Sequence, residues 1–117
     1  MIIGTPETRV GQYSEGCHDG IGPYFERVLL KNLPGCAITY VVDMVLPPGS
    51  SIGVHPHIGT EELYFIEAGM AVMVVDDEER LVGPGSAILN PHGHSHGLRN
   101  ESRDDVHLFV VRAKAPG

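Results

Sequence analysis

The chain has 117 residues, the length of about one domain, and 42% of them are hydrophobic, which is enough to form a core. Eight Lys and Arg against 15 Asp and Glu give a net charge of −7, which argues against binding to nucleic acid or to an anionic membrane surface. Apolar runs are far shorter than the ~20 residues of a membrane helix. The N-terminus has neither the basic nor the apolar stretch of a signal peptide, so we expect a cytoplasmic protein.

The pattern along the chain predicts short strands and no helix. Fifteen Gly and nine Pro interrupt every window in which apolar residues could repeat with helical spacing. Apolar and β-branched runs between turn residues predict strands at residues 23–31, 37–46, 61–68, 70–75, 80–82, 87–89, 97–100 and 106–112. This spacing favours an all-β sandwich or barrel, with residues 1–14 and 113–117 as arms outside the core.

The two cysteines, Cys17 and Cys36, allow one disulfide, but in a cytoplasmic chain we expect both thiols to be reduced. Cys17 adjoins His18, and a Cys-His pair can bind a metal ion when further ligands are near. No second pair supplies those ligands, so we interpret both residues as parts of a surface loop.

Histidines carry the main chemical signal, because five of the seven fall within 42 consecutive residues. His55 and His57 are two positions apart, so in an extended strand both imidazoles face the same way. Glu62 follows after a turn, and His96 comes from a distant segment. Three nitrogens and one oxygen suit a first-row divalent metal, although a solvated His-rich tract is the alternative on spacing alone.

The first part of this region resembles the first sequence motif of the cupin family. That motif is a Gly, five residues, H-x-H, three or four residues, a Glu, six residues and a Gly. The chain has Gly49, SSIGV, His55-Pro-His57, IGTE, Glu62, LYFIEA and Gly69 at these positions. The six-residue spacing to Gly69 places Glu62, and not its neighbour Glu61, at the motif position.

The second cupin motif is matched as well. It is a Gly, five residues, P-x-G, two residues, a His, three residues and an Asn. The chain has Gly85, SAILN, Pro91-His-Gly93, HS, His96, GLR and Asn100, and 15 residues separate the two motifs. Every specified position of both motifs is filled.

The resemblance implies one cupin domain over residues 1–117, a double-stranded β-helix or jelly-roll barrel, with motif 1 at 49–69 and motif 2 at 85–100. It implies one divalent transition metal held by His55, His57, Glu62 and His96. The ion could be Mn, Fe, Ni, Co, Cu or Zn, because ligand type alone does not choose among them. His92 and His94 are expected to be exposed in the second-motif turn.

Three further residues are predicted near the metal. Tyr64 and Leu98 share the strand face of Glu62 and His96, so they are expected to line the pocket, with packing in the core as the alternative for Tyr64. Arg27 lies in an otherwise apolar strand, where an inward guanidinium would suit a substrate carboxylate. An outer-face position is the alternative for Arg27.

The leading functional hypothesis is an enzyme that chelates a small carboxylate, hydroxy acid or dicarbonyl at the metal for isomerase, lyase or decarboxylase chemistry. An O2-dependent dioxygenase with Fe(II), and a non-catalytic metal-dependent binding protein, are the alternatives. Four protein ligands would leave two positions for water or a bidentate anion such as oxalate. We also expect a homodimer, because small barrels expose sheet edges that partner strands cover.

Overall fold

The computed structural model describes residues 1–5 and 10–117, and in this part of the chain the regular structure is all β apart from one short 3-10 turn. The elements are β1 (Gly11–Glu15), η1 (Cys17–Asp19), β2 (Pro23–Lys31), β3 (Ile38–Leu46), β4 (Ser51–Pro56), β5 (Thr60–Ala68), β6 (Ala71–Val75), β7 (Glu78–Val82), β8 (Ala87–Asn90), β9 (Ser95–Arg99) and β10 (Val106–Lys114). The predicted all-β class is confirmed.

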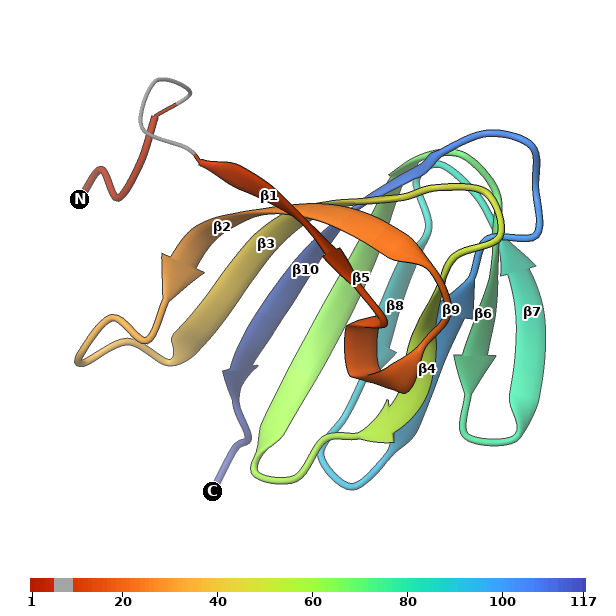
Figure 1. Cartoon of the computed structure of the whole chain (residues 1–117). Helices are drawn as coiled ribbons and strands as arrows, with labels where there is room; N and C mark the ends of the chain where they lie inside the picture. Colours follow the sequence, from red (N-terminus) through yellow and green to blue (C-terminus); the bar gives the residue numbers. More distant parts are fainter. Residues whose placement is uncertain (6–9) are drawn as a thin grey trace.

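Two antiparallel sheets face each other (Figure 1). The larger has six strands in the order β1-β2-β3-β10-β5-β8, and the smaller has four in the order β4-β9-β6-β7. Several neighbours, among them β4 and β9, and β5 and β8, come from distant parts of the chain, so residues of the two sequence motifs meet between the sheets. The strand pair β4 and β9 places His55 directly opposite His96.

Alternation along the strands directs one set of side chains between the sheets, where they form the core. The buried apolar residues are Val42, Met44, Leu46, Ile52, Tyr64, Ile66, Ala71, Met73, Val74, Leu98, Val106, Leu108 and Val110. The buried polar residues include His57, Glu62 and His96, so the metal-ligating residue types share the interior with this core.

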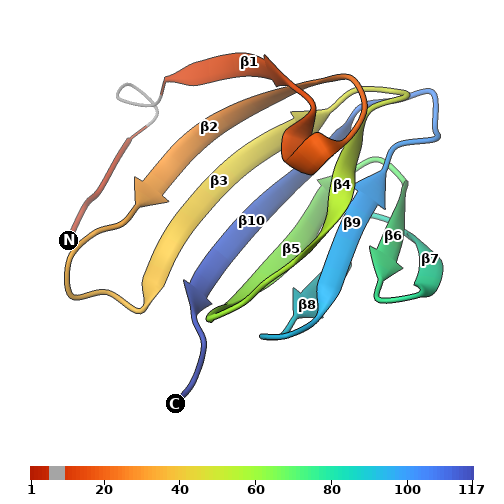
Figure 2. The same cartoon turned by 60° about the horizontal axis from the view of Figure 1, so that its bottom comes forward.

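The segment expected as an N-terminal arm contains a strand. Residues 11–15 form β1, which pairs with β2 at the edge of the larger sheet, and η1 then crosses towards β4 (Figure 2). Residues 6–9, which belong to the same expected arm, lie outside the described residues. No helix in the described part of the chain is long and apolar enough to cross a membrane.

Candidate metal centre

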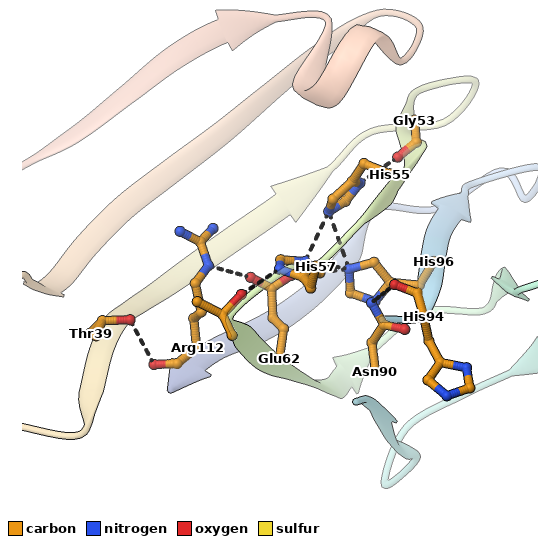
Figure 3. A network of polar contacts seen from close by, with 10 residues as sticks. Thr39, Gly53, His55, His57, Glu62, Asn90, His94, His96 and Arg112 are labelled. Atoms are coloured by element: carbon orange, nitrogen blue, oxygen red, sulfur yellow. Dashed lines mark hydrogen bonds and ion pairs between the residues drawn. The ribbon is translucent and has the colours of Figure 1, made fainter. Parts of the chain in front are cut away.

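Strands from both sheets bring together four side chains that could hold a metal ion. His55 lies on β4 and His57 directly follows that strand, so alternation places both imidazoles on the inner face. Glu62 comes from β5 and His96 from β9. Figure 3 shows the four side chains converging on one point between the sheets.

The ligating atoms are close enough to share one ion. The Nε2 atom of His57 is 3.2 Å from that of His55 and 3.1 Å from that of His96, and the Nε2 atoms of His55 and His96 are 3.2 Å apart. Glu62 Oε1 is 3.1 Å from Nε2 of both His57 and His96. All four ligand atoms lie within 4.8 Å of one another.

The positions of the protons on the histidine rings indicate that this cluster suits a cation. His55 Nδ1 is 2.7 Å from the Gly53 carbonyl oxygen and donates its proton there, so in the neutral ring Nε2 carries a lone pair directed at the cluster. His57 Nδ1 is 3.1 Å from Thr60 Oγ1, and with its proton donated there its Nε2 also carries a lone pair. Two lone pairs then face each other across 3.2 Å, an arrangement that a cation between them stabilises. Ligands about 2.1 Å from a metal at right angles lie about 3.0 Å apart, close to the spacings seen here.

The electrostatics favour the protonation states that bind metal. Burial lowers the pKa of His55 to about 4 and also lowers the pKa of His57, so both rings are neutral at pH 7. Burial acts to raise the pKa of the Glu62 carboxyl, but the hydrogen bond with His96, the proximity of the His57 and His96 rings and the charge of Arg112 outweigh it and lower the pKa to about 2. Neutral imidazoles and an ionised carboxylate are the ligand forms that metals require.

The second oxygen of Glu62 is held by an arginine. Arg112, on β10, donates from Nε to Glu62 Oε2 at 3.0 Å, and its guanidinium lies 4.8 Å from the centre of the Tyr40 ring. Figure 3 shows the two terminal nitrogens of Arg112 pointing away from this bond. In residues 1–5 and 10–117 neither terminal nitrogen has a hydrogen-bond partner in the protein.

A pocket of about 220 Å³ opens beside the cluster. It is bounded by Cys17, His18, Tyr24, Glu26, Tyr40, Val42, Met44, Ile52, Glu62, Tyr64, Val110 and Arg112. Its size suits a ligand smaller than a drug-sized molecule. The lining combines apolar side chains with two carboxylates, one guanidinium and three tyrosine hydroxyl groups.

A close backbone contact places η1 at the pocket. A Cβ at residue 53 would lie 2.0 Å from the carbonyl oxygen of His18, so only glycine lets η1 approach β4 this closely. His18 and Asp19 both have left-handed backbone angles, φ 49° and 60°. This turn stacks the His18 ring on His55, with ring centres 3.6 Å apart and planes at 9°.

The sequence model of the Cupin domain family matches residues 42–112, which contain the whole cluster. The chain belongs to the cupin family. A curated relative, an uncharacterized protein of Methanocaldococcus jannaschii, is 32% identical over 90 residues, which cover 71% of this cupin and 72% of that protein.

Two other curated relatives have descriptive names. The oxalate-binding protein of Thermotoga maritima is 34% identical over 68 residues, which cover 58% of this cupin and 56% of that protein. The dimethylsulfoniopropionate lyase DddQ of Ruegeria pomeroyi is 38% identical over 74 residues, covering 62% of this cupin and 35% of that protein. The cupin therefore spans little more than half of the first relative and about a third of the second.

Solved structures show the same fold. A predicted oxalate decarboxylase from Thermotoga maritima superimposes with a TM-score of 0.89 at 24% identity, covering 97% of this cupin and 99% of that chain. A protein from Thermus thermophilus gives a TM-score of 0.67 at 28% identity, covering 96% and 89%. The first likeness, below 25% identity, concerns the fold alone.

The three residues that were expected to line the pocket lie in three different environments. Tyr64 is fully buried, lines the pocket and has its ring centre 4.5 Å from that of His96. Leu98 is in the hydrophobic core and is not part of the pocket wall. Arg27 is paired with Asp43 at 3.2 Å on the face of the sheet opposite to the pocket, which agrees with the outer-face alternative.

The remaining histidines of the second motif lie outside the cluster. Nδ1 of His92 accepts a hydrogen bond from the Gly59 amide at 2.7 Å, and His94 pairs with Asp76 at 2.8 Å. Both side chains therefore have partners at the surface turn.

Both cysteines are free.

Sequence reasoning missed part of the pocket. Cys17 and His18 were interpreted as surface-loop residues, yet both line the pocket, and burial raises the pKa of the Cys17 thiol to about 11. Arg112 had a usable signal, because it alternates with Leu108 and Val110 along the last strand and so faces inward. No such signal exists for η1, whose position depends on packing against β4.

Proposed function

We propose that this cupin is a divalent-metal enzyme that binds a small carboxylate beside His55, His57, Glu62 and His96 and acts on it as a lyase, decarboxylase or isomerase. The observation that carries the proposal is the convergence of four ligand atoms next to a pocket of about 220 Å³. A divalent ion held by these residues would act as a Lewis acid on a carboxylate or carbonyl oxygen.

Arg112 supports a carboxylate as the ligand. Its Nε is committed to Glu62, and the terminal nitrogens of a guanidinium form paired hydrogen bonds with carboxylates. The same residue thus orients a metal-ligating side chain and presents donors to the pocket. This is the function that was expected of Arg27.

Two tyrosines supply neutral donors. Burial raises the pKa of Tyr40 to about 12 and also raises the pKa of Tyr24, so both hydroxyls keep their protons at pH 7. Both line the pocket. Protonated hydroxyls can donate to ligand oxygens on which negative charge develops, which lowers the barrier of reactions that pass through an enolate or carbanion.

The names of the relatives agree with this ligand class. One is an oxalate-binding protein and another is a lyase that acts on dimethylsulfoniopropionate, and both ligands carry a carboxylate. The lyase supports turnover, and the oxalate-binding protein supports chelation of a small carboxylate. For this cupin both remain proposals.

The test uses the purified chain loaded with Co2+, whose visible absorption reports changes among its ligands. Oxalate should bind to the loaded protein with an altered Co2+ spectrum and should not bind to the metal-free protein, as followed by calorimetry. A panel of small carboxylates is then incubated with the protein and followed by NMR for products.

Three results are decisive. Metal-dependent binding with product formation supports the proposed enzyme. Metal-dependent binding without a product from any carboxylate contradicts the enzyme and favours a binding protein. Equal oxalate binding with and without metal contradicts the proposed site.

A further inference from the structure

A second carboxylate lies in the pocket, away from the metal-ligating cluster. Glu26, on β2, lines the pocket together with Tyr24 of the same strand. Strands β3 and β10 separate β2 from β5, which carries Glu62. Three strand spacings amount to about 14 Å across the sheet, and the register places Glu26 level with Ile66, four residues along β5 from Glu62. Glu26 and Glu62 therefore approach the pocket from different sides.

The two carboxylates have different partners. Glu62 faces His57 and His96 with one oxygen and Arg112 with the other. Glu26 has a hydrogen bond from Gln12 Nε2, at 3.4 Å, and no cationic partner among the described residues that line the pocket. No described residue of the pocket lining therefore compensates its negative charge.

This charge acts on the interior of the pocket. After burial, Glu26 is the next largest cause of the raised pKa of both Cys17 and Tyr40. Cys17 lies on η1 and Tyr40 on β3. Charges at the cluster also act on both pKa values: Glu62 raises that of Cys17, and Arg112 lowers that of Tyr40. A ligand between them would lie in the field of Glu26 at one end and of Arg112 at the other.

We infer that Glu26 is a specificity-determining residue, which selects carboxylate ligands that carry a positive charge at their far end. The inference rests on the proposed function, because it assumes that the ligand's carboxylate lies at the metal and Arg112. A cation at the opposite end would then approach Glu26, whereas a second carboxylate there would be repelled. An anion as short as oxalate ends before it reaches Glu26 and is not discriminated.

The experiment compares two ligands of the same shape. Trimethylammonio-propanoate carries a fixed cation that cannot ligate a metal, and its carbon isostere has an uncharged tert-butyl group in the same place. Calorimetry of the Co2+-loaded wild type should show about fivefold or more tighter binding of the cationic ligand. Glu26→Gln should abolish that preference while its Co2+ content stays the same.

The control variant is Glu78→Gln, which removes the same charge from β7, in the other sheet. It should keep the wild-type preference, which excludes a simple effect of net charge. Equal affinities of the wild type for the two ligands, or a preference that survives Glu26→Gln, would overturn the inference. A wild type that binds no Co2+ would instead overturn the proposed metal site. Metal content is therefore measured in every sample.

Discussion

Arg112 and Glu62 form a partly buried link between the pocket and the ligand cluster, with Arg112 Nε 3.0 Å from Glu62 Oε2. Only 2% of the Glu62 side chain is exposed, so its charge depends on partners within the protein. The cluster uses one carboxylate oxygen and Arg112 uses the other. The stability of this pair should therefore depend on whether a metal is present.

Replacing Arg112 by Met should destabilise the metal-free protein by about 1–3 kcal/mol, because a buried carboxylate loses its charged donor. The loss should be smaller in the metal-loaded protein, where a cation compensates the same charge. Urea unfolding with and without a chelator measures both values. Arg99→Met is the control, since Arg99 pairs with Glu79 at the surface, and its loss should cost less stability than that of Arg112. An equal loss with and without metal for Arg112→Met would contradict the idea.

Removing one ligand should remove the metal and leave the fold intact. His96→Ala and Glu62→Ala should each bind far less metal, measured by mass spectrometry of the purified protein, while circular dichroism stays that of a β protein. His92→Ala is the matched control, because His92 belongs to the same motif but lies outside the cluster. Wild-type metal content in both ligand variants would show that other residues bind the ion.

The pH dependence of stability follows from the lowered pKa values of the histidines. His55 titrates near pH 4 in the folded protein, and His57 also below its ordinary value, whereas both titrate near ~6.5 when unfolded. The unfolded chain therefore takes up protons first as the pH falls, and metal-free protein should lose stability between about pH 6.5 and 4. Thermal unfolding measured across this range tests the sign. His55→Asn should flatten the curve, and a stability that rises on acidification would contradict the assignment.

The same low pKa values affect metal release by acid. Protons compete for an imidazole only near or below its pKa in the metal-free protein, so His55, with a pKa of about 4, should hold the ion well below pH 6.5. The lowered pKa of His57 acts in the same direction. Neutral rings are thus available to the ion over most of the range in which an exposed histidine would be protonated.

The motifs alone predicted which carboxylate joins the cluster. Glu61 and Glu62 are adjacent, and the spacing to Gly69 selects Glu62, which is buried beside the histidines. The short apolar runs between turn residues also predicted the all-β fold, because no window had the spacing of a helix. These features are local, and local patterns can be recognised in a sequence.

The rest of the pocket depends on contacts between distant segments. His18 reaches His55 only because η1 adopts left-handed backbone angles and rests against β4. Arg27 occupies the same kind of strand as Arg112 but faces Asp43 outside. Both are single arginines in apolar strands. In β2 apolar residues lie on both faces, so only the pairing of the strands decides which of its faces is inner.

The homodimer stays a prediction. In the described part of the chain, β1 forms one edge of the larger sheet, and Tyr13 on it is 79% exposed. An exposed edge strand is commonly covered by a partner. Light scattering should give twice the chain mass, and Tyr13→Lys should shift the population to monomers if β1 is the covered edge. A monomer mass for the wild type at all concentrations would contradict the dimer.

Replacing Gly53 should destabilise the protein more than removing the His18 side chain, which Gly53 helps to position. In Gly53→Ala the new Cβ would overlap the His18 carbonyl oxygen, so η1 must move away from β4, at a cost of about 1–3 kcal/mol. The ring of His18 would then leave His55, and the pocket would lose one wall. His18→Ala removes the ring without displacing the backbone, so it should cost less stability and leave Cys17 in place. Urea unfolding compares the two variants, and reaction of the Cys17 thiol with a maleimide reports the wall. Faster labelling is expected in Gly53→Ala only, and equal stability and labelling in wild type and Gly53→Ala would show that η1 accommodates a methyl group.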